Sequence, residues 1–498
     1  MDYQPKTEPF PHQLEIFEAT RDLAGHALFL EQGTGKSKIA IDTAAWLYEK
    51  GEIDTVITLA PKAVAPNWTY DEIPTHLPDR VAESTLSFLW RTERAKTKAY
   101  QASLPDVLAH TGLLWVSMSY DALMTENRKG ARPLKGLRRN FKGYEFTKEL
   151  LKRRVMLIMD ESARIKNPGA KRSKRVFAAS KHALFTRLLT GTPVSNSPFD
   201  VFSQLRCLDA EVWDRRGCAS FAAFKAVYGD WVENIRRDTG QRFKTLISYT
   251  NLADLHSIVD AMGSRRLLTE VMDLPDRIYQ KRRFDLTTKQ WSAYRALRDE
   301  CMVLLDSGEL ITAPLAITRL LRFQQLTSNY LVDDEGGVVQ IEDENPRLKC
   351  LRDVLEGVSG SAIVWAKFQK DIDQIAELCA AMEVTAVTYD GRTSAADREV
   401  ARNSLQDRSA RIFIGNPAAA GEGLTLHAAT TVIYYNTSFR LSDRLQSEAR
   451  AFRIGQKFPV IYIDIIANDT VDEHVVRALR EKVEVASIVT GDKLRQWI

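Results

Sequence analysis

Short runs of apolar and β-branched residues alternate along the chain with polar segments in which apolar residues recur at helical spacing. This alternation is typical of parallel α/β sheets, because a helix returns the chain to the start of each next strand. We therefore expect two α/β lobes of the nucleotide-binding type, on either side of a more helical middle at roughly 202–355. The predicted strands are 27–30, 55–60, 113–117, 155–159 and 186–189 in the first lobe, and 362–366, 384–389, 411–415, 431–435 and 460–466 in the second.

The composition agrees with a folded protein of several domains. At ~150 residues per domain, 498 residues correspond to roughly three domain-sized units. A hydrophobic fraction of 44% and a charged fraction of 27% exclude a disordered or collagen-like chain. No apolar run approaches the ~18 residues of a membrane span, and the first residues lack the pattern of a signal peptide, so we expect a cytoplasmic protein. Five cysteines without a CxxC pair argue against disulfides and structural zinc.

Basic charge is concentrated in one stretch of the chain. The net charge is only +4, but 128–187 holds 19 Lys or Arg against four acids, a local charge of +15 that leaves −11 for the rest. Such a stretch is a candidate for binding a phosphate backbone by counterion release. The alternative is an ordinary solvated basic face.

A phosphate-binding loop is predicted between the first strand and the helix that follows it. The segment runs Gly33-Thr34-Gly35-Lys36-Ser37. Its glycines let backbone N–H groups surround a phosphate, Lys36 would reach the β- and γ-phosphates, and Ser37 would bind Mg²⁺. Leu30 occupies the first glycine position of the full GxxxxGKS pattern, so a chance glycine-rich turn is the alternative.

Two acids end the predicted strand 155–159. Asp160 would hold Mg²⁺, directly or through water, and Glu161 would orient and deprotonate the attacking water. An exposed charged turn is the alternative for the acids alone. Both motifs fall in the same lobe, and the carboxyl ends of parallel strands meet at one edge of a sheet. Together they indicate ATP hydrolysis with ATP and Mg²⁺ as the ligands.

These two motifs belong to a longer series. The series resembles the helicase-like ATPases of superfamily two, and within it the Swi/Snf (sucrose non-fermenting) family of double-stranded DNA translocases. The resemblance covers most of the chain, and its most specific parts are RIKN, LTGTPVSN and QxxARxxRIGQ. In order, the motifs are PHQLEIF, EQGTGKS, LAPKAVAPNW, VSMSY, DESARIKN, LLTGTPVSN, VWAKF, DGRTSAADR, AAAGEGLTLHAA and DRLQSEARAFRIGQ.

The resemblance implies two RecA-like parallel-sheet lobes: an ATP-binding lobe one at 1–205, helical insertions and a linker at 206–345, and lobe two with C-terminal helices at 346–498. Gln13 would read the adenine. Arg450 and Arg453, three positions apart and therefore expected on one face of a helix, would be arginine fingers that stabilise charge during hydrolysis. The expected ATP site also includes Gly423 and Gln446.

The resemblance further implies contacts to the phosphates of double-stranded DNA, without sequence preference. The expected contact residues are Lys62, Thr192 and Asn196 in lobe one and Lys367 and Thr425 in lobe two. Trp68 either stacks on a base or fills the core, and a single tryptophan is more often a core residue.

The implied function is a DNA-dependent ATPase that translocates on double-stranded DNA and remodels DNA or protein–DNA complexes in replication, recombination or repair. Three alternatives remain: an ATP-gated nucleic-acid clamp, the motor subunit of a larger complex, and a true strand-separating helicase. One departure from the family concerns the acid motif, which reads Asp160-Glu161-Ser162-Ala163 and lacks the histidine that can couple the site to other motifs. A motor without further modules is more expected of a bacterium or its virus.

Overall fold

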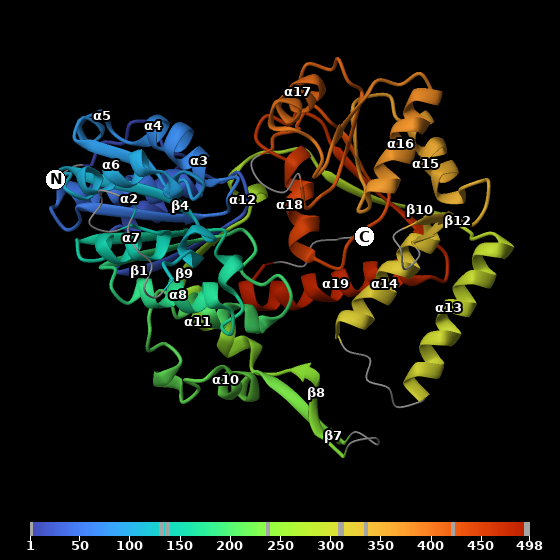
Figure 1. Cartoon of the computed structure of the whole chain (residues 1–498), viewed down its shortest axis with the longest axis horizontal. Helices are drawn as coiled ribbons and strands as arrows, with labels where there is room; N and C mark the ends of the chain where they lie inside the picture. The colour runs from blue at the N-terminus through green and yellow to red at the C-terminus, as the bar shows by residue number, and fades with distance from the viewer. Residues whose placement is uncertain are drawn as a thin grey trace. The chain divides into compact units, whose positions relative to one another are not determined.

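The computed structural model describes residues 3–128, 134, 140–235, 240–306, 313–332, 337–419 and 424–492. They form two compact units, each built on its own parallel sheet (Figure 1). The first unit contains the chain up to Trp231 together with Leu246–Asp273 and Val485–Asp492. The second contains Val232–Thr245 and Leu274–Glu484, so the last helix, α19 (Val471–Thr490), begins in the second unit and ends in the first.

The first unit has a seven-stranded parallel sheet in the order β3-β4-β2-β5-β6-β1-β9. Side chains of each strand alternate between two cores: Leu28 packs with helices α1 and α2, whereas Phe29 packs with α8 and α11. Covering of both faces explains why its central strands are continuous apolar runs. The strands are β1 (Gly25–Leu30), β2 (Thr55–Ala60), β3 (Thr85–Leu89), β4 (Leu113–Ser119), β5 (Val155–Asp160), β6 (Phe185–Leu189) and β9 (Gly263–Arg266); the main helices are α1 (Pro11–Thr20), α2 (Lys36–Glu49), α8 (Lys171–Ser180), α9 (Val201–Leu205) and α11 (Leu252–Met262).

The second unit has a six-stranded parallel sheet in the order β10-β17-β16-β13-β15-β14. Its core combines strand residues such as Val364 and Ile433 with Leu351 and Ile372 from flanking helices. The strands are β10 (Arg277–Phe284), β13 (Ala362–Trp365), β14 (Ala386–Tyr389), β15 (Ile412–Gly415), β16 (Thr431–Tyr434) and β17 (Val460–Ala467); the helices include α14 (Ala313–Thr327), α15 (Pro346–Glu356), α16 (Gln369–Ala381), α17 (Ala395–Gln406) and α18 (Leu441–Ala451).

All ten predicted strands are present, with ends that differ by one or two residues, and the α/β class with two parallel-sheet lobes is confirmed. The predicted helical middle is incomplete as a description, because it also supplies strands β9 and β10, one for each sheet, and a hairpin of β7 (Gly229–Ile235) and β8 (Arg242–Tyr249). Both β9 and β10 lie at sheet edges and are rich in arginine, so neither gave an apolar run.

Four cysteines of the described ranges, Cys207, Cys218, Cys350 and Cys379, carry free thiols. Within the same ranges, no helix combines the length and apolar character needed to cross a membrane.

Candidate functional site

The phosphate loop lies where the sequence predicts it, between the end of β1 at Leu30 and the start of α2 at Lys36. Gly33 and Gly35 have φ angles of 86° and 85°, in the left-handed region that favours glycine. A Cβ atom on Gly35 would also lie only 2.1 Å from Nε2 of Gln13. Gly35 is therefore required both by its backbone conformation and by the close approach of helix α1.

Helix α1 holds the phosphate loop from the side. Nε2 of Gln13 donates to the carbonyl of Thr34 at 3.1 Å, and Nε2 of His12 lies 2.8 Å from the same oxygen. Oε1 of Gln13 accepts from the backbone N–H of Phe10 at 3.1 Å. Gln13 thus ties the start of α1 to the loop, while adenine recognition by this residue stays a prediction.

The Lys36 amine is turned toward the base of the loop. Its Nζ donates to the carbonyls of Leu30 at 2.9 Å and Glu31 at 3.1 Å. Burial lowers the pKa of Lys36, and the carboxylates of Glu161 and Asp160 act in the opposite direction. The structure therefore brings the loop lysine and the two predicted acids into one electrostatic neighbourhood. Ser37 follows in the first turn of α2, where it is half-buried.

Asp160 is the last residue of β5, and its carboxylate is restrained from two directions. Nε1 of Trp68 donates to Oδ2 at 2.9 Å, and the backbone N–H of Glu161 donates to Oδ1 at 2.9 Å. The hydroxyl of Tyr120 donates to the Asp160 carbonyl at 2.8 Å. Trp68 is 1% exposed, so the core assignment is confirmed, and its polar edge has the further task of orienting Asp160.

Glu161 occupies an uncommon backbone conformation. Its φ and ψ are 51° and 54°, a left-handed geometry that costs a non-glycine residue about 1–2 kcal/mol. The hydroxyl of Thr190 donates to Oε2 of Glu161 at 3.4 Å. Strain of this kind persists where the surroundings fix the residue, as at functional sites.

The turn after β6 contacts both the phosphate loop and Glu161. A Cβ on Gly191 would lie 3.3 Å from the carbonyl of Leu30, so this turn approaches the phosphate loop closely. The backbone N–H of Thr192 donates to Oγ1 of Thr190 at 3.2 Å, and that of Asn196 donates to Asp200 at 2.7 Å. The turn therefore connects the Glu161 contact to the predicted DNA contacts Thr192 and Asn196.

Lys62 lies on the surface of the first unit and follows β2, the sheet neighbour of the strand that leads into Asp160 and Glu161, here called the acid turn. Its side chain is 76% exposed and pairs with Glu93 at 3.0 Å. Lys62 is accessible to a phosphate backbone, at the cost of exchanging one surface ion pair.

The basic stretch 128–187 is only partly available as a surface. Positions 129–133 and 135–139 lie outside the described residues. Arg153 and Arg154 both pair with Asp54, and Lys171 pairs with Glu126. Arg187 is 1% exposed and donates to backbone carbonyls. The local charge of the sequence therefore overstates the positive surface, because several of its members have structural partners.

In the second unit, Arg450 and Arg453 meet at one backbone oxygen. Their Nη1 atoms donate to the carbonyl of Leu424 at 3.2 and 3.3 Å, and Arg453 also donates to Oγ1 of Thr425 at 3.0 Å. The expectation of a shared helix face is wrong, because α18 ends at Ala451. Phe452 has an extended backbone, with ψ of 91°, so Arg453 reaches Leu424 from beyond the helix.

Two other residues predicted for the ATP site belong to the same part of the chain. Gln446 is half-buried in α18. Gly423 lies outside the described residues.

Lys367 follows β13 and is less available than a surface lysine. Its Nζ donates to Oε1 of Gln324 in α14 at 2.6 Å. Burial lowers the pKa of Lys367 to about 8, with Arg440 acting in the same direction and Asp443 in the opposite one. A phosphate contact by Lys367 stays a prediction, and it requires the amine to leave Gln324.

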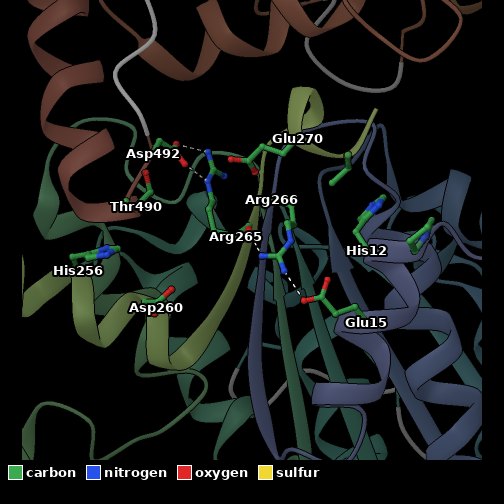
Figure 2. Close-up of a pocket in the computed structure, with 12 residues that line it drawn as sticks. His12, Glu15, His256, Asp260, Arg265, Arg266, Glu270, Thr490 and Asp492 are labelled. Atoms are coloured by element: carbon green, nitrogen blue, oxygen red, sulfur yellow. Dashed lines mark hydrogen bonds and ion pairs between the residues drawn. The ribbon is translucent and has the colours of Figure 1, made fainter. Parts of the chain in front are cut away.

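A cavity of about 730 Å³ opens at the end of β9 in the first unit (Figure 2). The backbone N–H of Glu31, in the phosphate loop, donates to the carbonyl of Arg266 at 2.9 Å, so the cavity adjoins that loop. In Figure 2, Arg265 points to Asp492 and Arg266 to Glu15, with closest distances of 2.7 and 2.8 Å. The sequence did not predict that Arg265 and Arg266 line a cavity, because β9 is short and contains no recognisable motif. The lining residues are Pro11, His12, Glu15, His256, Asp260, Arg265, Arg266, Glu270, Val271, Thr490, Gly491 and Asp492.

Two family models match the chain. The SNF2-related domain matches residues 18–330, and the Helicase conserved C-terminal domain matches residues 346–455. The first match alone covers more than half of the chain.

Curated relatives match over most of this chain but over a smaller part of their own. Mouse "DNA annealing helicase and endonuclease ZRANB3" is 27% identical over 352 residues, which cover 68% of this chain and 30% of that protein. "Nuclear protein STH1/NPS1" of Saccharomyces cerevisiae is 23% identical over 487 residues, with 91% and 32% covered. The chain thus spans about a third of the length of these relatives.

Among solved structures, the Sulfolobus solfataricus SWI2/SNF2 ATPase core in complex with dsDNA is 20% identical and matches 99% of this chain and 95% of that chain, with a TM-score of 0.40. A TM-score of this size carries no conclusion about this chain.

Proposed function

The chain belongs to the SNF2-related family of helicase-like ATPases, and from this premise we propose that it is a DNA-stimulated ATPase that translocates on double-stranded DNA. The observation that carries the proposal is that the phosphate loop with Lys36 follows β1 and the acids Asp160 and Glu161 follow β5, at the same carboxyl end of the first sheet, where the acids raise the pKa of Lys36 against the effect of burial. A phosphate-binding lysine beside two carboxylates is the arrangement that hydrolysis of a nucleoside triphosphate needs.

The chain's own residues suit a magnesium–nucleotide complex. No group of three or more His, Cys, Asp or Glu side chains in the described part of the chain is placed to hold a metal. Mg²⁺ in nucleotide sites usually takes few protein ligands and completes its shell with phosphates and water. The Ser37 hydroxyl and the Asp160 carboxylate would hold the ion, which would neutralise phosphate charge when bound. Glu161, kept near Thr190, would accept the proton of the attacking water.

The cavity beside the phosphate loop is the candidate position for the nucleoside part of ATP. Its wall contains His12, whose Nε2 also contacts the loop at Thr34. Gln13, the next residue, does not line the cavity, so an adenine contact requires its amide to leave Thr34 or Phe10. In the second unit, Gln446 is a proposed nucleotide contact, and Arg450 and Arg453 are proposed arginine fingers, which stabilise charge in the transition state.

Support for a DNA partner comes from residues and relatives together. Lys62 and Asn196 are exposed in the first unit, and both follow the carboxyl ends of strands near the acid turn. The mouse relative is named as a DNA annealing helicase and endonuclease. Contacts from such residues to phosphates give binding without sequence preference. Thr192, Lys367 and Thr425 would add to them.

A clamp that binds nucleic acid and hydrolyses ATP rarely is the second candidate. Ala163 favours it, because no side chain at this position can couple the acids to neighbouring motifs.

Steady-state ATP hydrolysis tests the proposal. We expect duplex DNA to stimulate hydrolysis more than single-stranded DNA or RNA, and Lys36→Ala to abolish the stimulated rate. Glu161→Gln separates the two candidates. A motor with this substitution loses all movement along DNA, whereas a clamp keeps or tightens its binding to DNA, which is its whole function. Equal rates with and without any nucleic acid would contradict the translocase.

A further inference from the structure

A buried side-chain bond follows the acid turn and matches no motif of the sequence. Ser162 is fully buried, and its Oγ donates to Oε1 of Gln204 at 2.8 Å. Gln204, in α9, is also fully buried, and its Nε2 donates to the carbonyls of Pro193 at 2.8 Å and Asp200 at 2.9 Å. Carbonyls only accept, so the orientation of the amide is fixed and each of its polar atoms is used.

These bonds join the acid turn to the loop after β6. The loop is itself organised by Asp200, whose Oδ2 accepts from the backbone N–H of Ser195 at 3.0 Å and of Asn196 at 2.7 Å. Gln204 contacts this loop at both ends, through Pro193 and Asp200. A continuous series of hydrogen bonds therefore joins the predicted DNA contact Asn196 through Asp200 and Gln204 to Ser162.

Ser162 is the residue next to Glu161, which has the left-handed conformation. The backbone of Glu161 keeps such a conformation only where its neighbours fix it. On the preceding side, the Asp160 carboxylate accepts from the Glu161 N–H; on the following side, the Ser162 side chain is fixed by Gln204. The Ser162–Gln204 bond therefore holds the residue that directly follows Glu161, while Thr190 contacts the Glu161 carboxylate itself.

We propose that Gln204 is a positioning residue through which the Thr190–Asp200 loop sets the Glu161 carboxylate for hydrolysis when DNA is bound. In this chain the Ser162–Gln204 pair supplies the coupling that Ala163 cannot supply. The inference rests on the proposed function, because it concerns DNA-stimulated hydrolysis.

The first test compares two serine substitutions that each remove one buried hydroxyl bond. Ser162→Ala removes the bond to Gln204, whereas Ser173→Ala removes a 2.9 Å bond from a 2% exposed serine to the Ile165 carbonyl. We expect Ser162→Ala to lower the duplex-stimulated kcat by about three- to tenfold, the range of one buried hydrogen bond. The KM of Ser162→Ala for ATP should stay within about twofold of the unsubstituted value, since the phosphate loop is untouched. The control Ser173→Ala should keep the full kcat and have a Tm similar to that of Ser162→Ala.

A second set of variants asks whether the two residues act as a pair. Gln204→Leu lowers the stimulated kcat at least as much as Ser162→Ala, the double variant loses no more than Gln204→Leu, and Ser162→Thr, which keeps the hydroxyl, recovers most of the rate. If Gln204→Leu does not fold, Ser162→Ala and Ser162→Thr decide the question alone.

Three results overturn the inference. They are a Ser162→Ala rate equal to that of Ser173→Ala, additive losses in the double variant, and a loss confined to KM. Failure of the unsubstituted protein to respond to duplex DNA is a different result, because it removes the proposed function and the inference together.

Discussion

The predicted nucleotide contacts of the first unit and those of the second unit are held in place differently. In the first unit, the acid turn is restrained by side chains from four separate segments, and those side chains are Trp68, Tyr120, Thr190 and Gln204. In the second unit, Arg450 and Arg453 both donate to the carbonyl of Leu424. The carboxylates are therefore positioned by the packed core of one unit, whereas the arginines are positioned together with one loop.

A third arginine of the second unit, Arg444, differs from these two because its partners are buried carboxylates. Arg444 is 2% exposed and donates to both carboxylate oxygens of Asp464, at 2.5 and 2.9 Å, and to Glu448 at 2.6 Å. Two carboxylates thus neutralise Arg444, while a carbonyl and a hydroxyl receive hydrogen bonds from Arg453. The two carboxylates indicate that Arg444 supports the fold, while the role of Arg453 as an arginine finger stays a prediction.

The largest expected effect comes from Arg453→Ala. Loss of an arginine finger lowers the hydrolysis rate by on the order of 10³ to 10⁵. Single-turnover kinetics should show this loss with an unchanged Tm. The contrasting variant is Arg444→Met, which removes the arginine that neutralises the buried carboxylates of Asp464 and Glu448 and costs about 3–5 kcal/mol of folding stability. If Arg453→Ala unfolds the protein and Arg444→Met only slows it, the assignment of the two arginines is reversed.

The next effect concerns the acid turn. Glu161→Gln removes the general base and should lower hydrolysis by about 10² to 10⁴, because the amide cannot accept the proton of water. ATP binding, followed by isothermal titration, should stay within about threefold, a change of less than the 1.4 kcal/mol that corresponds to tenfold. A Glu161→Gln variant that hydrolyses at the unsubstituted rate would remove Glu161 from the mechanism.

A smaller effect is expected for Trp68→Phe, which keeps an aromatic ring and removes the donor to Asp160. Hydrogen bonds to charged groups are worth about 1.5–3 kcal/mol, so the rate should fall by on the order of tenfold or more. The Mg²⁺ concentration for half-maximal rate should rise, because the carboxylate loses its orientation. The control is Trp115→Phe, because the Trp115 ring stacks on Trp68 at 6.4 Å but its Nε1 donates to Thr58 at 3.0 Å and not to an acid. The same magnesium shift in both variants would contradict the role of Trp68.

The smallest effect is a pH dependence of DNA binding. Lys367, with its pKa lowered to about 8, is charged below that pH and loses its charge above it. Between pH 7 and 9, the slope of log K against log salt for a duplex should therefore decrease by about 0.9, the contribution of one phosphate. Lys367→Arg should remove the change, because a guanidinium stays charged. A slope that does not change with pH in the unsubstituted protein would exclude Lys367 as a phosphate contact.

Much of the fold could be predicted from the sequence, because buried parallel strands leave continuous apolar runs such as 155–159. The edge strand β14 was predicted at 384–389, but the edge strands β3, β9 and β10 were not. In β9, Arg265 and Arg266 pair with residues that are distant in sequence, Asp492 and Glu15. The phosphate loop and the acids were predictable because glycine and carboxylate chemistry is local. The residues that hold the acids in place could not be predicted. Trp68 and Gln204 have the sequence pattern of ordinary core residues, and their roles depend on tertiary contacts.

The central claim is that ATP hydrolysis moves the protein along double-stranded DNA. The most direct measurement is displacement of a third strand from a duplex that carries a triplex segment ahead of a bound protein. The account predicts displacement that requires ATP, leaves the two strands of the duplex paired, and disappears in Glu161→Gln. A protein that hydrolyses ATP on duplex DNA and leaves the third strand bound would contradict translocation.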